Sequence, residues 1–167
     1  MKLQKAVVPV ELLSRSTMSI VGKLEDLVEL LNDSQRCYAE AAEHVSDPKL
    51  KDQFMEFGNG RSPMIMGLGD ELAKLGEETP MEGTAKGDLH RTWMDLKEKL
   101  TGRDEARWLK ECERGDTYLL ERYDEVLGMP EITLHLRTML QEHQGKVRAD
   151  LSELKMMKQL NENELYE

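Results

Sequence analysis

Two residues suited to acid–base or metal chemistry, Asp116 and His143, fall on the apolar faces of two predicted helices. Side chains at such positions lie inside a helical bundle, where polar groups must bind a ligand or satisfy one another. Carboxylate and imidazole groups are common ligands of transition metals, so Asp116 and His143 could hold one ion together with Glu113. A single metal site at these three residues is therefore one hypothesis.

A buried polar cluster is the alternative hypothesis for the same region. Gln35, Tyr38 and Arg61 lie at equivalent depths on the other two predicted helices and are the expected neighbours of Asp116 and His143. Side chains of these types can saturate one another with hydrogen bonds and so fix the register of the helices. The residue types favour this interpretation, because buried polar groups are usually satisfied by one another.

A complete di-iron centre is not expected. Di-iron carboxylate bundles take a Glu from each of two helices and a Glu-x-x-His motif from each of the other two. No Glu-x-x-His motif occurs in this chain, because Leu140 stands three residues before His143 and Ile132 stands three residues before His135. The cofactor, if there is one, stays unassigned.

The two cysteines, Cys37 and Cys112, lie far apart in the sequence and form neither a CxxC motif nor a metal-type spacing. We interpret both as buried thiols, and Cys112 as an inert core residue. Neither a secretory h-region nor an apolar run of the roughly 18 residues needed for a membrane span is present. These features predict a cytoplasmic protein without membrane insertion.

The charge balance bears on the partners of the protein. The chain has 23 Lys and Arg against 33 Asp and Glu, a formal net charge of −10 at pH 7. This sign repels phosphate backbones, so nucleic acid is not an expected partner. A second copy of this chain or another protein remains as the partner.

The chemistry-bearing residues are positioned by four long predicted helices. The pattern predicts helices from Ser19 to Val45, from Pro48 to Leu75, from Asp104 to Leu127, and from about residue 130 to Lys158. Asp47 and Pro48 make a tight turn between the first two, and Gly128 and Pro130 make one between the last two. Pro63 and nearby glycines predict a kink near residues 59–63.

The domain boundaries follow from this pattern. Residues 1–17 lack a helical period and are expected to form a flexible arm, residues 18–158 the bundle, and residues 159–167 a frayed tail. A sharper hypothesis takes Met18 as the native start of the protein.

The long connection between the second and third long helices decides the topology. Residues 76–87 are a polar loop, and residues 88–100 have the pattern of a short helix. Extended, a loop of that length reaches roughly 40 Å, about the length of a 27-residue helix. The chain can therefore cross the whole bundle once, which predicts an all-α four-helix bundle with one long crossover that contains a short helix.

Three strings resemble an uncharacterised bacterial family, a domain of unknown function with a ferritin-like four-helix-bundle structure. They are YAEAAEHVSDPKLKDQF (38–54), LHRTWMDLKEKLTGRDE (89–105) and ECERGD (111–116). The resemblance spans about residues 18–157 and implies the ferritin-like fold, but it carries no established activity. Where relatives tend to have acidic residues, this chain has Gln35, Gly60 and Gly67.

Two functions from different classes follow. The first is a non-enzymatic ferritin-like bundle that acts by self-association or by binding another protein. The second is a metal-binding or redox-active ferritin-like protein with a reduced set of ligands. The missing Glu-x-x-His motifs favour the first.

Overall fold

The computed structural model describes residues 10–80 and 105–164, and within these ranges every regular element is an α-helix. The helices are α1 (Val10–His44), α2 (Pro48–Asn59), α3 (Arg61–Lys74), α5 (Glu105–Leu127) and α6 (Leu134–Glu164). None of the described helices is both long enough and apolar enough to cross a membrane. The predicted short helix at 88–100 lies outside the described residues.

Both outer boundaries differ from the sequence prediction. Helix α1 begins at Val10 rather than at Ser19, directly after Pro9, a residue that blocks a helix before it but permits one after it. Helix α6 continues to Glu164, so the predicted frayed tail is helical from residue 159 to that point. The first helix therefore begins earlier, and the last helix ends later, than the apolar pattern predicted.

The turn between α1 and α2 has the predicted chemistry. Asp47 caps α2, since its Oδ1 accepts a hydrogen bond from the backbone N–H of Lys49 at 2.9 Å, and Pro48 is the first helical residue. The carboxylate of Glu105 accepts hydrogen bonds from the backbone N–H groups of Ser46 and Asp47, at 2.9 and 3.2 Å. The start of α5 is thus held against this turn.

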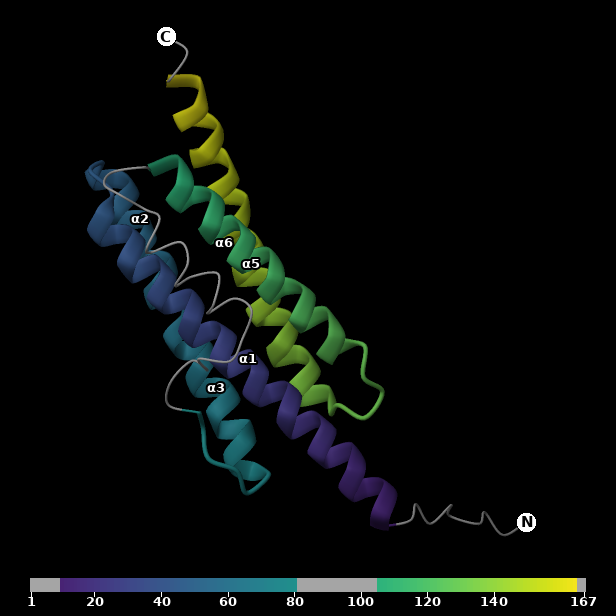
Figure 1. Ribbon diagram of the computed structural model, residues 1–167. Helices are drawn as coiled ribbons and strands as arrows, with labels where there is room; N and C mark the ends of the chain where they lie inside the picture. The colour runs from purple at the N-terminus through teal and green to yellow at the C-terminus, as the bar shows by residue number, and fades with distance from the viewer. Residues whose placement is uncertain (1–9, 81–104, 165–167) are drawn as a thin grey trace.

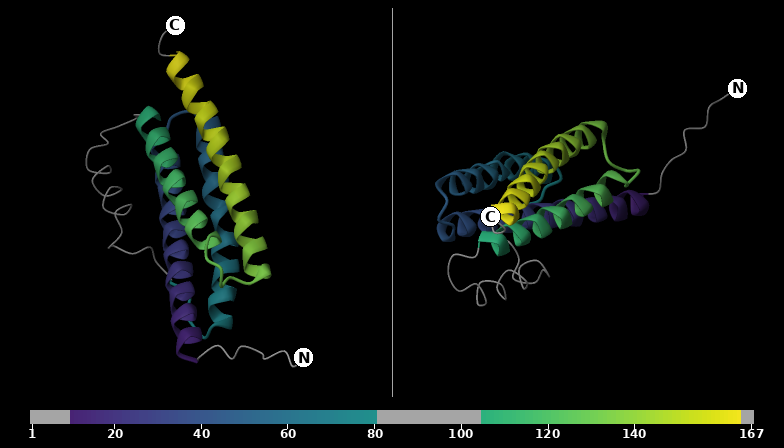
Figure 2. Two further views of the ribbon diagram at one scale, coloured as in Figure 1. Left: turned by 90° about the vertical axis from the view of Figure 1, so that its right-hand side faces the viewer. Right: turned by 90° about the horizontal axis from the view of Figure 1, so that it is seen from above.

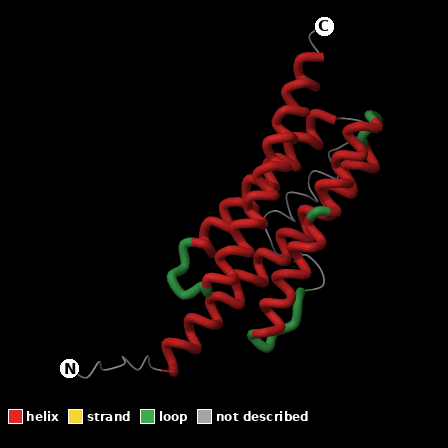
Figure 3. The backbone as a smooth tube through the Cα atoms, turned by 180° about the vertical axis from the view of Figure 1, so that it is seen from behind, coloured by secondary structure: helices red, strands yellow, loops and turns green. Residues whose placement is uncertain are grey.

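The predicted kink is confirmed as a break at Gly60, between α2 and α3. Figure 3 shows it as a short interruption in an otherwise continuous rod. Pro63 has no N–H to donate to the carbonyl of Asn59, which interrupts the helical hydrogen bonds at this point. Helix α3 ends at Lys74, one residue before the predicted Leu75, and Gly76 is the predicted stop residue, with a φ of 81°. Hydrogen bonds from Gly76 N to Ala73 O and from Glu77 N to Leu72 O complete a Schellman motif there.

The connection between α5 and α6 is longer than predicted. Helix α5 ends at Leu127, but α6 begins only at Leu134. Thr133 caps α6, because its Oγ1 accepts a hydrogen bond from the N–H of Leu136 at 3.1 Å.

Helices α2 and α3 together form one rod, and with α1, α5 and α6 this makes four rods. The four rods form a bundle with one crossover. Helix α3 ends at one end of the bundle, whereas α5 begins beside the α1–α2 turn at the other end, so the second and third rods run in the same direction (Figure 1). Around the bundle, α1 contacts α5, α5 contacts α6, α6 contacts α3, and α3 contacts α1 (Figure 2). This arrangement confirms the predicted one-crossover topology.

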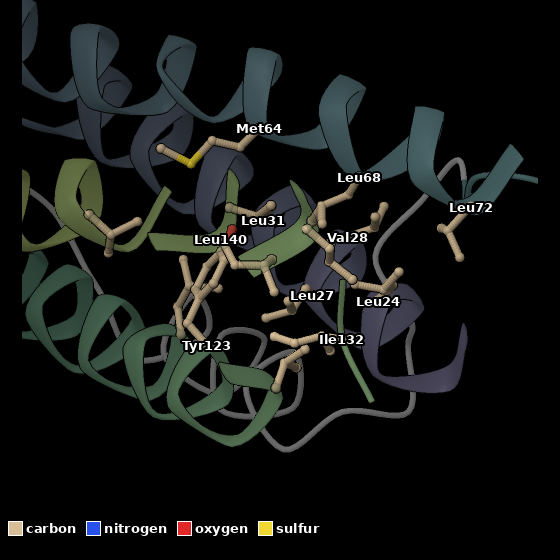
Figure 4. Packing of buried hydrophobic residues seen from close by; sticks show 14 residues of the cluster. Leu24, Leu27, Val28, Leu31, Met64, Leu68, Leu72, Tyr123, Ile132 and Leu140 are labelled. Carbon is tan, nitrogen blue, oxygen red and sulfur yellow. The ribbon is translucent and has the colours of Figure 1, made fainter. Parts of the chain in front are cut away.

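The interior consists of two apolar clusters. One, at the end where α3 stops, contains Leu31, Met64, Leu68 and Leu140 among others (Figure 4). The other, at the end of the α1–α2 turn, contains Phe54, Phe57, Trp108 and Leu154. Buried polar residues lie on all four rods at the level between the clusters.

Candidate functional site

The polar layer, as we call the buried residues Ser34, Tyr38, Arg61, Asp116 and Asp150, joins all four rods of the bundle. Arg61 of α3 lies at its centre with no exposed surface. Its Nη2 donates to Asp116 Oδ2 on α5 at 3.0 Å, its Nη1 to Asp150 Oδ2 on α6 at 2.6 Å, and its Nε to Ser34 Oγ on α1 at 3.1 Å. One guanidinium thus connects three other helices.

The two carboxylates of the polar layer are saturated. Asp116 accepts from Ser34 at Oδ1 and from both Tyr38 and Arg61 at Oδ2, with the Tyr38 bond only 2.5 Å long. Asp150 accepts from Arg61 at Oδ2 and from Lys146 at Oδ1. All four carboxylate oxygens are therefore occupied by donors from the protein itself.

The electrostatics follow from burial. Burial alone would lower the pKa of Arg61, but the charge of Asp116 beside it reverses this effect and raises the pKa above its usual value. Burial raises the pKa of Asp116, while the nearby Arg61 guanidinium and three hydrogen bonds oppose that rise. Burial, and then the charge of Asp116, raise the pKa of Tyr38, so its hydroxyl stays protonated and donates.

Three of the five residues expected in a buried cluster are brought together, namely Tyr38, Arg61 and Asp116. Gln35 instead donates to Ser62 at 2.7 Å at the α1–α3 contact. His143 lies in a separate contact, where its Nδ1 is 3.1 Å from the hydroxyl oxygen of Tyr123. Burial lowers the pKa of His143 to about 4, which keeps the ring neutral near pH 7.

Two members of the polar layer were missed by sequence reasoning, Ser34 and Asp150. Spacing on α6 contained a signal for Asp150, since Leu140, His143, Val147 and Asp150 follow alternating intervals of three and four residues. The neighbouring Leu151 is buried as well, so both positions face the interior. Ser34 interrupts the apolar face of α1 and could have been included for that reason.

The hypothesis of one metal site at Asp116, His143 and Glu113 does not fit the geometry. Asp116 is saturated within the polar layer, His143 contacts Tyr123, and Glu113 accepts from Lys158 at 3.0 Å near the surface. In the ranges 10–80 and 105–164, no three His, Cys, Asp or Glu side chains are grouped so that they could hold a metal ion. A ferritin-type di-iron centre fits no better, because the polar layer holds carboxylates from α5 and α6 only, and both are bonded to the Arg61 guanidinium at its centre.

The two cysteines lie side by side, a contact that the sequence did not predict. Cys37 of α1 and Cys112 of α5 have their sulfur atoms 3.5 Å apart, although 75 positions separate them in the chain. Cys112 is buried and Cys37 is half-buried. Together with Tyr38 and Asp116 they line a small pocket beside the polar layer.

Comparisons with known proteins agree with this fold. The family model described as "Domain of unknown function (DUF2383)" matches residues 19–129. No curated protein matches the chain.

Two solved structures share the architecture. A mutant of Mycobacterium smegmatis Dps1 has a TM-score of 0.67 at 12% identity and covers 86% of this chain and 97% of its own. A dodecameric thioferritin, the bacterioferritin-related protein from Bacteroides fragilis, has a TM-score of 0.58 at 14% identity and covers 86% of this chain and 90% of its own. At these identities the likeness shows the fold alone. The chain therefore belongs to the family of the domain of unknown function DUF2383, with a ferritin-like four-helix-bundle fold.

Proposed function

We propose that this protein is a non-enzymatic ferritin-like bundle that acts by self-association. The observation that carries the proposal is an exposed apolar face at the C-terminal end of α6. Met156 and Leu160 lie one turn apart on this helix, and 62% and 63% of their surfaces are exposed. Residues four positions apart lie on one face of a helix, so together they form a single apolar patch.

The position of this patch supports an intermolecular contact. The last turns of α6 extend beyond the start of α5 and beyond the α1–α2 turn (Figure 1). Leu154 is the last fully buried residue of α6, and the helix continues to Glu164. Met157 still packs on the second apolar cluster, and Lys158 pairs with Glu113 of α5. A helix segment with little tertiary packing is only marginally stable in water, so packing against a second copy would stabilise the turns that follow Lys158.

The polar layer supports a structural role for the bundle interior. The Arg61 guanidinium and the Lys146 ammonium together balance its two carboxylates. All four carboxylate oxygens accept hydrogen bonds, and each of the four rods contributes a side chain. Buried polar networks of this kind align helices in one register, which a self-associating bundle needs in order to present a constant surface. The Bacteroides fragilis thioferritin with the same fold is dodecameric, which adds support by analogy.

The test is the mass of the purified full-length protein in solution, measured by light scattering over a range of concentrations, with elemental analysis of the same sample. We expect a defined multimer that contains no stoichiometric metal. A monomer at every concentration would overturn self-association as the function.

The metal-binding alternative is tested by the same sample. Iron, zinc or manganese bound in stoichiometric amount would favour a ferritin-like protein with a reduced ligand set over a purely structural bundle. Heat of binding in a titration with each metal gives an independent measurement.

A further inference from the structure

Two sulfur atoms and a pocket meet at the contact between α1 and α5. The Sγ atoms of Cys37 and Cys112 are 3.5 Å apart, and they are the two cysteines of the chain. The pocket that both line has a volume of about 20 Å³, enough for roughly one molecule of the size of water. Asp33, Glu111 and Arg114 also line it, and Glu111 and Arg114 form an ion pair.

We propose that Cys37 and Cys112 form a redox-active dithiol, which a small neutral hydroperoxide oxidises to a disulfide that joins α1 to α5. A disulfide requires sulfur atoms about 2 Å apart, and a small rearrangement of the two side chains covers the remaining distance. The inference is independent of self-association, since both thiols belong to one chain.

The size of the pocket selects the oxidant. Hydrogen peroxide is a neutral molecule close to water in size, so it matches the volume of the pocket. A peptide disulfide such as oxidised glutathione is many times larger than the pocket, so its volume disfavours its entry. Hydrogen peroxide is therefore the expected oxidant class.

Burial gives the two thiols different roles. Cys37 is half-buried and opens to the pocket, whereas Cys112 is buried. Burial, and then the interaction with Cys37, raise the pKa of the Cys112 thiol well above its usual value. Because the thiolate is the nucleophile, Cys37 attacks the oxidant and Cys112 resolves the product.

The chemistry balances in two steps. The Cys37 thiolate attacks one oxygen of hydrogen peroxide, the O–O bond breaks, and hydroxide leaves and takes a proton to become water, which leaves Cys37 as a sulfenic acid. Cys112 then loses its proton and attacks Cys37 Sγ, the S–O bond breaks, and the departing hydroxide takes up a proton as a second water. Two thiols lose two electrons and two protons, and the peroxide is reduced to water. A small dithiol need not enter the pocket to reverse the reaction, because it can attack the half-buried Cys37 Sγ; the S–S bond breaks with the Cys112 thiolate as leaving group. The second thiol of the reagent then displaces Cys37, which releases the oxidised reagent and restores both thiols.

The direct test uses reduced full-length protein exposed to hydrogen peroxide and then quenched with N-ethylmaleimide. We expect an intact mass lower by about 2 Da, a non-reducing digest containing one peptide pair joined through Cys37 and Cys112, and full reversal by dithiothreitol. Because the experiment uses the unsubstituted chain, it does not depend on how any variant folds. Alkylation of both cysteines at peroxide doses that already oxidise methionines would overturn the proposal, as would disulfides that join only separate chains.

Two matched variants test the assigned roles. In Cys112→Ser, Cys37 should accumulate as a sulfenic acid that dimedone traps, because its resolving partner is missing. In Cys37→Ser, Cys112 should remain a free thiol at the same dose. Equal dimedone labelling of the two variants would overturn the division of roles, and circular dichroism checks that each variant keeps the helical fold.

Discussion

At the level of single residues, Arg61 determines what the centre of the bundle can do. Its side chain reaches the other three rods. Its guanidinium also lies over the ring of Tyr38, with the Cζ atom 5.5 Å from the ring centre. The planar fork of arginine donates in several fixed directions at once, which a lysine cannot reproduce. The centre is therefore filled by a permanent cation rather than by a set of open ligands.

Arg61→Met should destabilise the protein by about 3 to 5 kcal/mol, because it leaves Asp116 and Asp150 buried without their cation. The measurement is the free energy of unfolding in urea. Arg114→Met is the matched control, since it removes an arginine whose ion pair with Glu111 is partly exposed and should cost less than about 1 kcal/mol. Equal costs for the two variants would contradict the role assigned to Arg61.

A compensated variant separates the loss of pairing from the loss of shape. The triple variant Arg61→Met, Asp116→Leu and Asp150→Leu removes the two buried carboxylates together with the guanidinium that pairs with them. This triple variant should be more stable than Arg61→Met alone, because no buried charge is left uncompensated.

His143 should make stability sensitive to acid. Its folded-state pKa is lowered by burial to about 4, whereas an unfolded chain titrates its histidines near 6.5. The folded state therefore keeps the ring neutral in a pH range where the unfolded chain binds a proton. The free energy of unfolding is at its full value above pH 6.5 and decreases as the pH falls from 6.5 towards 4. The expected loss is on the order of 1 kcal/mol, after a discount for the partly exposed ring.

The check is urea unfolding at several pH values between 4 and 7 for the original chain and for His143→Gln. The variant should lose less stability across this window. His135→Gln is the control, because His135 lies on the same helix with 70% of its side chain exposed. An unchanged pH profile in His143→Gln would contradict the prediction.

At the level of elements, a glycine in α2 explains a segment that looked unfavourable for a helix. A Cβ atom at Gly58 would lie 3.2 Å from the Cβ of Tyr38 and 3.4 Å from the carbonyl oxygen of Gln35. Gly58 therefore lets the backbone of α2 approach α1 at the residue that donates to Asp116. What sequence reasoning treated as weak helix propensity serves helix packing.

Gly58→Ala should destabilise the protein by about 1 to 3 kcal/mol, because the added methyl group pushes α2 away from α1 and strains Tyr38. Gly145→Ala in α6 is the matched control, since nothing lies within 4 Å of a Cβ there. That control should stabilise the helix by about 0.5 to 1 kcal/mol through higher helix propensity. Thermal unfolding followed by circular dichroism compares the two variants. If both changed the stability in the same direction, the result would argue against close packing at Gly58.

Thr133→Ala should cost about 1 kcal/mol, because it removes the side-chain oxygen that caps α6. Thr138→Ala is a fitting control one turn into the same helix. There the hydroxyl bonds only the carbonyl of Leu134, an interaction that contributes little to a helix. Urea unfolding should show a loss for the first variant and little or no loss for the second, and similar losses would contradict the cap.

At the level of the whole molecule, the end of α6 should control self-association. Met156→Glu combined with Leu160→Glu replaces the exposed apolar patch with charges, on a chain whose net charge is already −10. The mass in solution should fall towards that of a monomer, while helix content and thermal stability stay close to those of the original chain. Ser152→Glu, an exposed substitution nearer the middle of α6, controls for added charge. An unchanged mass in the double variant would exclude this patch as the contact.

The sequence by itself determined the number of long helices, the cap at Asp47, the break near Gly60, the stop at Gly76 and the single crossover. These features depend on local backbone chemistry and on periodicity, which act within a few residues of each other. The same reasoning placed Tyr38, Arg61 and Asp116 inside the bundle. It ended α6 too early, because a helix end without a clear stop residue is set by weak local preferences. It began α1 too late, because the segment after Pro9 has no apolar period to mark it as helical.

Only the tertiary structure decided which buried groups meet. Asp150 rather than His143 pairs with Arg61, and Cys37 meets Cys112 across 75 positions of sequence. Such choices depend on how each helix is rotated about its axis and shifted along its neighbour, and small changes in either select a different side chain. Packing of the two apolar clusters sets that rotation and shift, and packing involves all four rods at once.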